Sequence, residues 1–281
     1  MQVLKQPTPQ VKDVETLQLS ANGPLPKRSL SDLFVNGSRP GTLQEPSAIV
    51  NVGLELRKKY SLINQIAENS QGNRVRAFFA AALLIAVPVF IQAPLVRVAP
   101  TLSFFITGLW LWLGYRWLKK PHLSLWGDLI VGFSWTWLAG TIYWGWFRAD
   151  PYIHLPIESI GLPFVLTLMR YGKANVGNYF YLGSLLGTAI TDLYFYCVGL
   201  IPYWRQLMIS DPSNAGVILH SALLRMGTYE GVGYAIVLLS LLVMLGTIPI
   251  RSRSVRWWAF SGAILSTILV DSLFFIAAIL A

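Results

Sequence analysis

Four acidic side chains, Asp128, Glu158, Asp192 and Asp271, stand in strongly apolar stretches of this 281-residue chain. An ionisable group in the middle of a membrane helix costs roughly 2.5–3.5 kcal/mol on the lenient insertion scale, and such groups typically mark an ion or proton route. No Lys or Arg stands in the middle of these stretches. We therefore expect the acids to be protonated or to bind a cation. Asp128 lies near the end of its stretch, so a position at the membrane–water interface explains why an acid is tolerated there.

Asp192 and Asp271 have similar surroundings, GTAITDLYF at 187–195 and STILVDSLF at 266–274. Both fall near the middle of a segment, and both segments are expected to run in the same direction. We predict that the two carboxyls lie at similar depth in the interior, close enough to share a proton or hold one cation. The alternative is a protonated carboxyl bonded to a neighbouring Ser or Thr. We interpret the likeness of the two stretches as chance similarity rather than as an internal repeat.

His154 and Glu158 are four residues apart and share one face of a helix if a helix begins near Pro156. This spacing could pass a proton, with an interfacial hydrogen-bonded pair as the plainer alternative. Two ligands are too few for a zinc site, so no metal is predicted. In another segment, Gly183 and Gly187 form a small-xxx-small pattern that permits close helix packing.

These residues are positioned by seven apolar segments, in a chain that is 54% hydrophobic and only 12% charged. Backbone polar groups in hydrocarbon must be satisfied within each segment, so the segments are predicted to be transmembrane helices. The fourth contains Pro163 and could be a bent span or a re-entrant element. The fold class is therefore all-α, a polytopic seven-helix membrane bundle, with segments at about 77–96, 98–118, 124–147, 153–169, 179–201, 231–249 and 257–280.

The basic residues between the segments set the orientation. Alternate connections carry ten of them: Arg74, Arg76, Arg116, Lys119, Lys120, Arg170, Lys173, Arg251, Arg253 and Arg256. The other connections carry only Arg97, Arg148, Arg205 and Arg225, partly offset by acids. The positive-inside rule then predicts a cytoplasmic N-terminus and a C-terminus on the opposite side.

The residues before the first segment form two further regions. Residues 1–46 are rich in Pro, Ser, Gly and Gln and are predicted to be a disordered cytoplasmic extension. Residues 47–76 are predicted to contain an amphipathic helix, which either lies on an anionic membrane surface or packs on the protein's own loops. Residues 77–281 are the membrane domain.

Several classes of function are excluded or disfavoured. The excess of nine positive charges lies mostly between apolar segments rather than on a basic face, which argues against nucleic acid. The phosphate-binding loop, the Gly-x-Ser-x-Gly elbow and the His-Glu-x-x-His motif are all missing, no cofactor is implied, and a membrane enzyme is the third choice. Two classes remain: proton- or cation-coupled transport, and a non-catalytic scaffold for a larger membrane complex. A wet cavity at the acids favours transport, whereas a dry bundle favours scaffolding.

Two stretches, YFYLGSLLGTAITDLYFYCVGLIPYWRQLM at 179–208 and HLPIESIGLP at 154–163, resemble a cyanobacterial family of integral membrane proteins, domain of unknown function 3120. The resemblance extends over about residues 75–281. It implies a cyanobacterial thylakoid or plasma membrane, and a photosynthetic complex as partner in the scaffold alternative. It supplies no activity and no catalytic residue.

Overall fold

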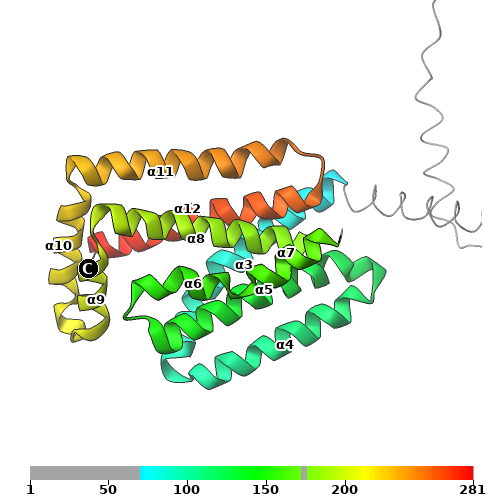
Figure 1. Cartoon of the computed structure of the whole chain (residues 1–281), viewed down its shortest axis with the longest axis horizontal. Coiled ribbons are helices and arrows are strands. Elements are labelled where there is room, and N and C mark those ends of the chain that lie inside the picture. Colours follow the sequence, from blue (N-terminus) through cyan, green and yellow to red (C-terminus); the bar gives the residue numbers. More distant parts are fainter. Residues whose placement is uncertain (1–69, 172–175, 281) are drawn as a thin grey trace, which may run out of the picture. The chain divides into compact units, whose positions relative to one another are not determined.

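The computed structural model describes residues 70–171 and 176–280, and within these ranges every regular element is a helix (Figure 1). The predicted extension at 1–46 lies outside the described residues, as does the predicted amphipathic region at 47–76 up to residue 69; residues 71–76 belong to the first helix. The first helix begins at Gln71, ahead of the expected 77, and the Ser70 side chain caps it by accepting a hydrogen bond from the Asn73 backbone N–H.

Six long helices form the body of the described chain. They are α3 (Gln71–Val98), α4 (Pro100–Leu118), α5 (Ser124–Ile142), α8 (Val176–Val198), α11 (Tyr229–Thr247) and α12 (Val255–Leu280). Shorter helices and single turns connect them: η2 (Pro121–Leu123), η3 (Tyr143–Phe147), η4 (Pro151–Ile153), α6 (His154–Glu158), η5 (Ser159–Gly161), α7 (Leu162–Arg170), α9 (Ile201–Ile209), η6 (Pro212–Asn214), α10 (Ala215–Met226) and η7 (Ile248–Arg251).

Each of the seven expected segments is helical, and the fourth is divided into α6, η5 and α7. The division comes just before Pro163, which stands in the first turn of α7. Proline is tolerated there because the first backbone N–H groups of a helix have no partner within the helix. The proline thus starts a new helix rather than bending a continuous one.

Several of these helices are suited to a bilayer. Within the described residues, four stretches are long and apolar enough to cross one, and the bent pair α8–α9 would be a fifth. The four are Gln71–Val98, Pro151–Arg170, Tyr229–Arg251 and Val255–Leu280. The all-helical fold and its apolar spans agree with the sequence analysis, and the full count of seven spans stays a prediction.

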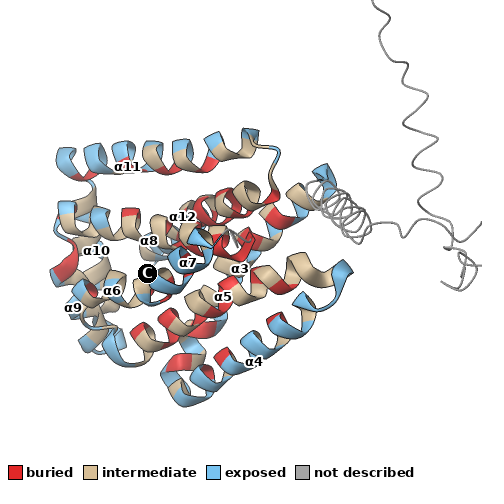
Figure 2. Cartoon of the chain, turned by 45° about the vertical axis from the view of Figure 1, so that its right-hand side comes forward, coloured by how far each residue is buried: buried red, intermediate tan, exposed pale blue. Residues whose placement is uncertain are grey.

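Helix α12 lies at the centre of the packing and runs against both α3 and α8, while α5 packs on α4 and α8. Buried positions are most frequent on α5, α8 and α12, whereas α4 and α11 present mostly exposed residues (Figure 2). The largest buried cluster combines small residues on α3 and α12, such as Ala81 and Ala263, with aromatic ones on α5, such as Phe133 and Trp137. Small residues allow the central helices to approach closely.

Glycine residues determine two features of the backbone, a close helix crossing and a tight turn. A Cβ added at Gly132 of α5 would meet the backbone of Gly177 of α8, and one added at Gly177 would meet the backbone of Asp128 on α5, so only glycine permits this crossing. At the end of α8, Gly199 has a φ of 75°, in the left-handed region that glycine adopts readily. The chain turns there by 101° into α9.

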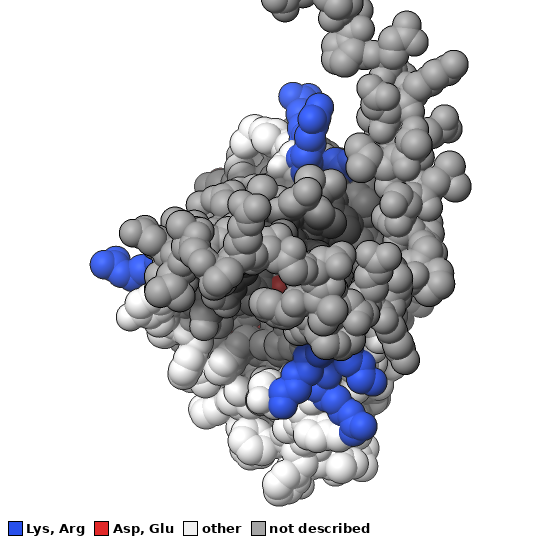
Figure 3. Space-filling model, turned by 90° about the vertical axis from the view of Figure 1, so that its right-hand side faces the viewer, with Lys and Arg blue, Asp and Glu red and all other residues white. Residues whose placement is uncertain are grey.

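The basic connections gather at one end of the bundle. Consecutive lengthwise helices run in opposite directions, so the start of α3, the α4–α5 and α11–α12 connections and the end of α7 all lie at the same end (Figure 1). Figure 3 looks onto this end, and Lys and Arg side chains stand at several places around its edge. The described basic residues that the orientation argument places on one side therefore belong to element ends at one end of the bundle.

Candidate functional site

A cavity of about 190 Å³ lies between α3, α5, α6, α8 and α12. Its apolar walls include Phe133, Trp137, Trp144 and Phe274. Its polar lining comes from Gln92, Thr136, His154, Glu158, Ser184, Thr188, Thr191, Asp192, Thr267 and Asp271. All four residues that the sequence analysis singled out for proton or cation binding thus line the same cavity, although they come from three separate helices.

His154, the first residue of α6, contacts the carboxylate of Asp192 on α8. Its Nδ1 lies 2.9 Å from Oδ1 and 3.0 Å from Oδ2. The ring of Tyr143 packs beside the imidazole, with the two ring centroids 4.2 Å apart. The sequence analysis found no basic partner for Asp192 because it considered only Lys and Arg within the segments. The partner is a histidine 38 positions away in the chain.

The other nitrogen of the same imidazole faces Glu158. His154 Nε2 lies 3.8 Å from Glu158 Oε1, one helical turn along α6. This distance allows electrostatic attraction but is too long for a hydrogen bond. Glu158 is only 9% exposed, and its carboxylate accepts no hydrogen bond from the described part of the chain. Its backbone carbonyl, in contrast, accepts a 2.7 Å hydrogen bond from the Tyr181 hydroxyl, which fixes α6 against α8.

Asp271 of α12 is held by a hydroxyl rather than by a cation. Thr191 Oγ1 donates to Asp271 Oδ2 at 2.8 Å, across the contact between α8 and α12. This is the arrangement expected under the alternative of a carboxyl bonded to a neighbouring Thr. Because Thr191 directly precedes Asp192, the two acids are joined through one residue of α8 and face the same cavity.

Two glycines set the spacing of the helices that carry this pair. A Cβ added at Gly183 would lie 2.5 Å from the backbone oxygen of Phe260, and one added at Gly187 would meet the side chain of Thr267. Gly187 stands one turn before Thr191, and Thr267 stands one turn before Asp271. The glycine contact therefore brings Thr191 within hydrogen-bonding reach of Asp271.

The sequence analysis missed a buried polar network beside the cavity. The Gln92 amide nitrogen donates to the Trp137 backbone oxygen at 2.7 Å and to Thr141 Oγ1 at 2.9 Å. Thr141 in turn shares a 2.8 Å hydrogen bond with Ser103, whose backbone oxygen accepts from the Trp137 indole at 3.0 Å. The available signal was Gln92 itself, an amide within the apolar segment 77–96.

The ionisable groups of this cavity are mostly acidic. No Lys or Arg stands among the residues that line it, so three carboxyls face one imidazole. Within residues 70–171 and 176–280, no three His, Cys, Asp or Glu side chains are grouped so that they could hold a metal ion. Asp128 is partly buried near the start of α5 and does not line the cavity.

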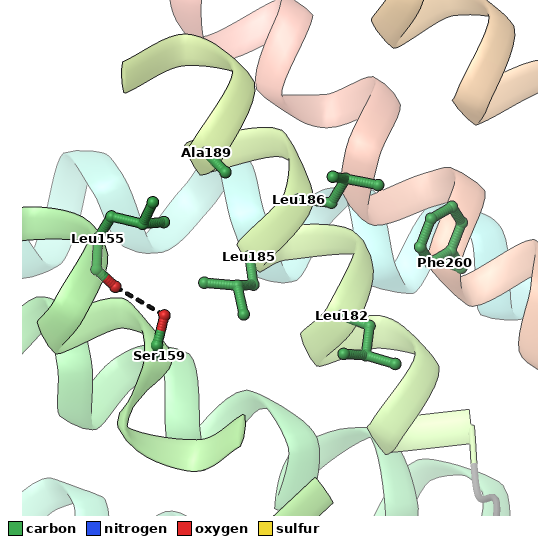
Figure 4. Close-up of a pocket in the computed structure, with 7 residues that line it drawn as sticks. All are labelled: Leu155, Ser159, Leu182, Leu185, Leu186, Ala189 and Phe260. Carbon is green, nitrogen blue, oxygen red and sulfur yellow. Dashed lines mark hydrogen bonds between the residues drawn. The ribbon is translucent and has the colours of Figure 1, made fainter. Parts of the chain in front are cut away.

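A second hollow, about 390 Å³, lies along α8 between α6 and α12 (Figure 4). Its walls are leucine, alanine and phenylalanine side chains. The one hydroxyl in its lining, on Ser159, donates to the Leu155 backbone oxygen at 2.8 Å and is already satisfied. The groove can therefore pack against apolar groups, but its lining provides no side chain for catalysis or for binding a polar ligand.

Comparison of the chain with curated proteins and with solved structures found no significant match. The sequence model of one protein family matches residues 81–279, which include every residue of the cavity described above. The family is described as "Protein of unknown function (DUF3120)". This agrees with the resemblance noted in the sequence, and the chain belongs to the DUF3120 family.

Proposed function

We propose that this protein is a multi-pass membrane transporter that couples movement of its substrate to protons or cations through the cavity lined by His154, Glu158, Asp192 and Asp271. One observation carries the proposal. Side chains separated by up to 117 positions, 154 to 271, converge on one cavity among apolar helices. Ionisable groups are costly in such surroundings, and their usual role is to form an ion or proton path.

The hydrogen-bonding pattern supports a path for a proton or a cation. His154 contacts Asp192 with one nitrogen and faces Glu158 with the other. Histidine can accept a proton on one nitrogen and release it from the other, so it can connect two carboxylates. Thr191 extends the polar chain to Asp271, because a hydroxyl can donate and accept at the same time.

The proposal includes seven crossings, with the N-terminus in the cytoplasm and the C-terminus on the opposite side. The basic end formed by the start of α3, the α4–α5 and α11–α12 connections and the end of α7 supports this orientation. Helices α4 and α5 pack alongside the apolar spans, and we count them among the seven crossings for that reason. For the membrane itself we propose a cyanobacterial thylakoid or plasma membrane.

The second candidate is a non-catalytic assembly or scaffold factor for a photosynthetic membrane complex. The apolar groove along α8 favours this candidate, since it offers a packing surface to a neighbouring membrane protein. It leaves the buried acids without a role, and we rank it below transport for that reason.

The experiment that separates the two candidates is reconstitution of the purified full chain in lipid vesicles. A pH-sensitive dye inside the vesicles reports proton movement under imposed gradients of sodium, potassium or membrane potential. Transport predicts proton or cation movement above that of protein-free vesicles. Absence of movement, together with a stoichiometric partner that copurifies from native membranes, would favour the scaffold.

A further inference from the structure

The acid-lined cavity combines carboxyl groups with aromatic walls, and this combination indicates what it binds. We infer that its ligand is a small organic cation, an ammonium group on a compact apolar body of about six to eight non-hydrogen atoms. The inference deepens the proposed function and rests on it, because it names the substrate class of the same cavity.

The first argument is the unsatisfied carboxylate. Asp192 is engaged by His154 and Asp271 by Thr191, but Glu158 accepts no hydrogen bond from the described part of the chain. Glu158 is nine-tenths buried and faces the cavity. A buried carboxylate without hydrogen-bond donors is unfavourable, and a ligand that brings donors into the cavity relieves that cost. An ammonium group has three N–H donors and a positive charge.

The second argument is size. A cavity of about 150 Å³ lined by apolar side chains holds a benzene molecule, and the cavity here measures about 190 Å³. A proton or a bare metal ion would itself fill only a small part of this volume. A ligand with a body as large as a benzene ring and a small cationic group fills it.

The third argument is the chemistry of the walls. Trp137, Trp144 and Phe133 contribute aromatic rings, and α3 contributes apolar positions such as Leu84 and Val89. Aromatic faces attract organic cations, and desolvation strengthens that attraction. Divalent metals prefer several oxygen ligands that surround one point, and the described His, Cys, Asp and Glu side chains form no such group. The walls therefore suit an amphipathic cation better than a metal.

The inference is tested by calorimetric titration of the purified full chain in detergent. The probes are benzylammonium, benzyl alcohol, which has the same shape without the charge, and sodium chloride. We expect benzylammonium to bind at least about tenfold more tightly than benzyl alcohol, the difference expected of one charged hydrogen bond. Asp271→Asn and Glu158→Gln should each remove most of that preference. Asp150→Asn is the control, because Asp150 pairs with Arg205 at 3.1 Å on the exposed end of the protein.

A thermal unfolding curve of each variant shows whether it is folded. If Asp271→Asn is not folded, Glu158→Gln alone is used for the test. Equal affinity for benzylammonium and benzyl alcohol would overturn the inference, as would full benzylammonium affinity in both folded variants. Saturable sodium binding without amine binding would also overturn it, while leaving cation-coupled transport intact. Amine binding that depends on Asp271 or Glu158, without any ion movement in vesicles, would support the inference and instead contradict the proposed function.

Discussion

The imidazole of His154 and the carboxylate of Asp192 are joined at 2.9 and 3.0 Å, with both carboxylate oxygens close to the same ring nitrogen. The opposite nitrogen lies 3.8 Å from Glu158. His154 is therefore the common neighbour of two acids on two helices. In a low-dielectric interior such neighbours influence one another strongly, so a change of charge at either acid acts on the other through the ring.

Replacement of His154 tests this connection. His154→Phe retains a ring that can pack on Tyr143 but cannot bond Asp192, which leaves a buried carboxylate without its partner. We expect ion movement in vesicles to fall at least about tenfold and the free energy of unfolding to fall by about 1–3 kcal/mol. His122→Phe is the matched control, since His122 is exposed in the α4–α5 connection. Equal activity of the two variants would contradict a role for His154.

The link between α8 and α12 is tested at Thr191. Thr191→Val keeps the shape of the side chain but removes the hydroxyl that donates to Asp271. We expect reduced ion movement with small loss of stability, about 1 kcal/mol, because Asp271 can still reach the cavity. Thr247→Val provides the comparison, since that hydroxyl bonds only the Val243 carbonyl of its own helix and is exposed. Unchanged transport in Thr191→Val would remove Thr191 from the path.

The close contact of α8 with α12 predicts a stability effect. Gly183→Ala places a Cβ about 2.5 Å from the backbone oxygen of Phe260, which cannot rotate away. We expect the helices to separate at a cost of about 1–3 kcal/mol, measured as a lower midpoint of thermal unfolding. Gly233→Ala is the control, because nothing lies within 4 Å of its added Cβ and alanine favours a helix. A midpoint of Gly183→Ala at or above that of Gly233→Ala would show that the contact is looser than described.

Reporter fusions test the topology. Fusions after Lys120 and after Tyr171 should report the cytoplasmic side, and a fusion after Ser210 should report the opposite side. The basis is the common end at which the basic connections gather. An opposite-side signal after Tyr171 together with a cytoplasmic signal after Ser210 would mean that the α6–α7 stretch does not cross the membrane, and would invert α8, α11 and α12.

Much of the fold could be predicted from hydropathy alone. All seven apolar segments are helical, because a backbone in apolar surroundings has few other ways to satisfy its polar groups. The division of the fourth segment was indicated by Pro163, although the sequence could not choose between a bent span and a re-entrant one. Gly183 and Gly187 were predicted to be packing positions; in the structure a Cβ added at either would meet α12, a neighbour that the sequence could not name.

The site was less accessible to sequence reasoning. Asp192, Asp271, Glu158 and His154 could be picked out because charged or polar groups are rare among apolar residues. Which of them touch could not be predicted, since the contact of His154 with Asp192 depends on how α6 packs against α8. Gln92 was overlooked because an uncharged amide disturbs the hydropathy of a segment only slightly, although its two hydrogen bonds tie α3 to α5.

The central claim is that Asp192 and Asp271 belong to one functional site, and ion movement by their amide variants tests it most directly. Asp192→Asn and Asp271→Asn keep size and hydrogen bonding but cannot release a proton or carry negative charge. The account predicts that both variants accumulate and unfold like the unchanged protein in a thermal melt, yet lose the proton or cation movement seen with that protein and with Asp150→Asn in lipid vesicles. Movement at the unchanged rate in either folded variant would contradict the account.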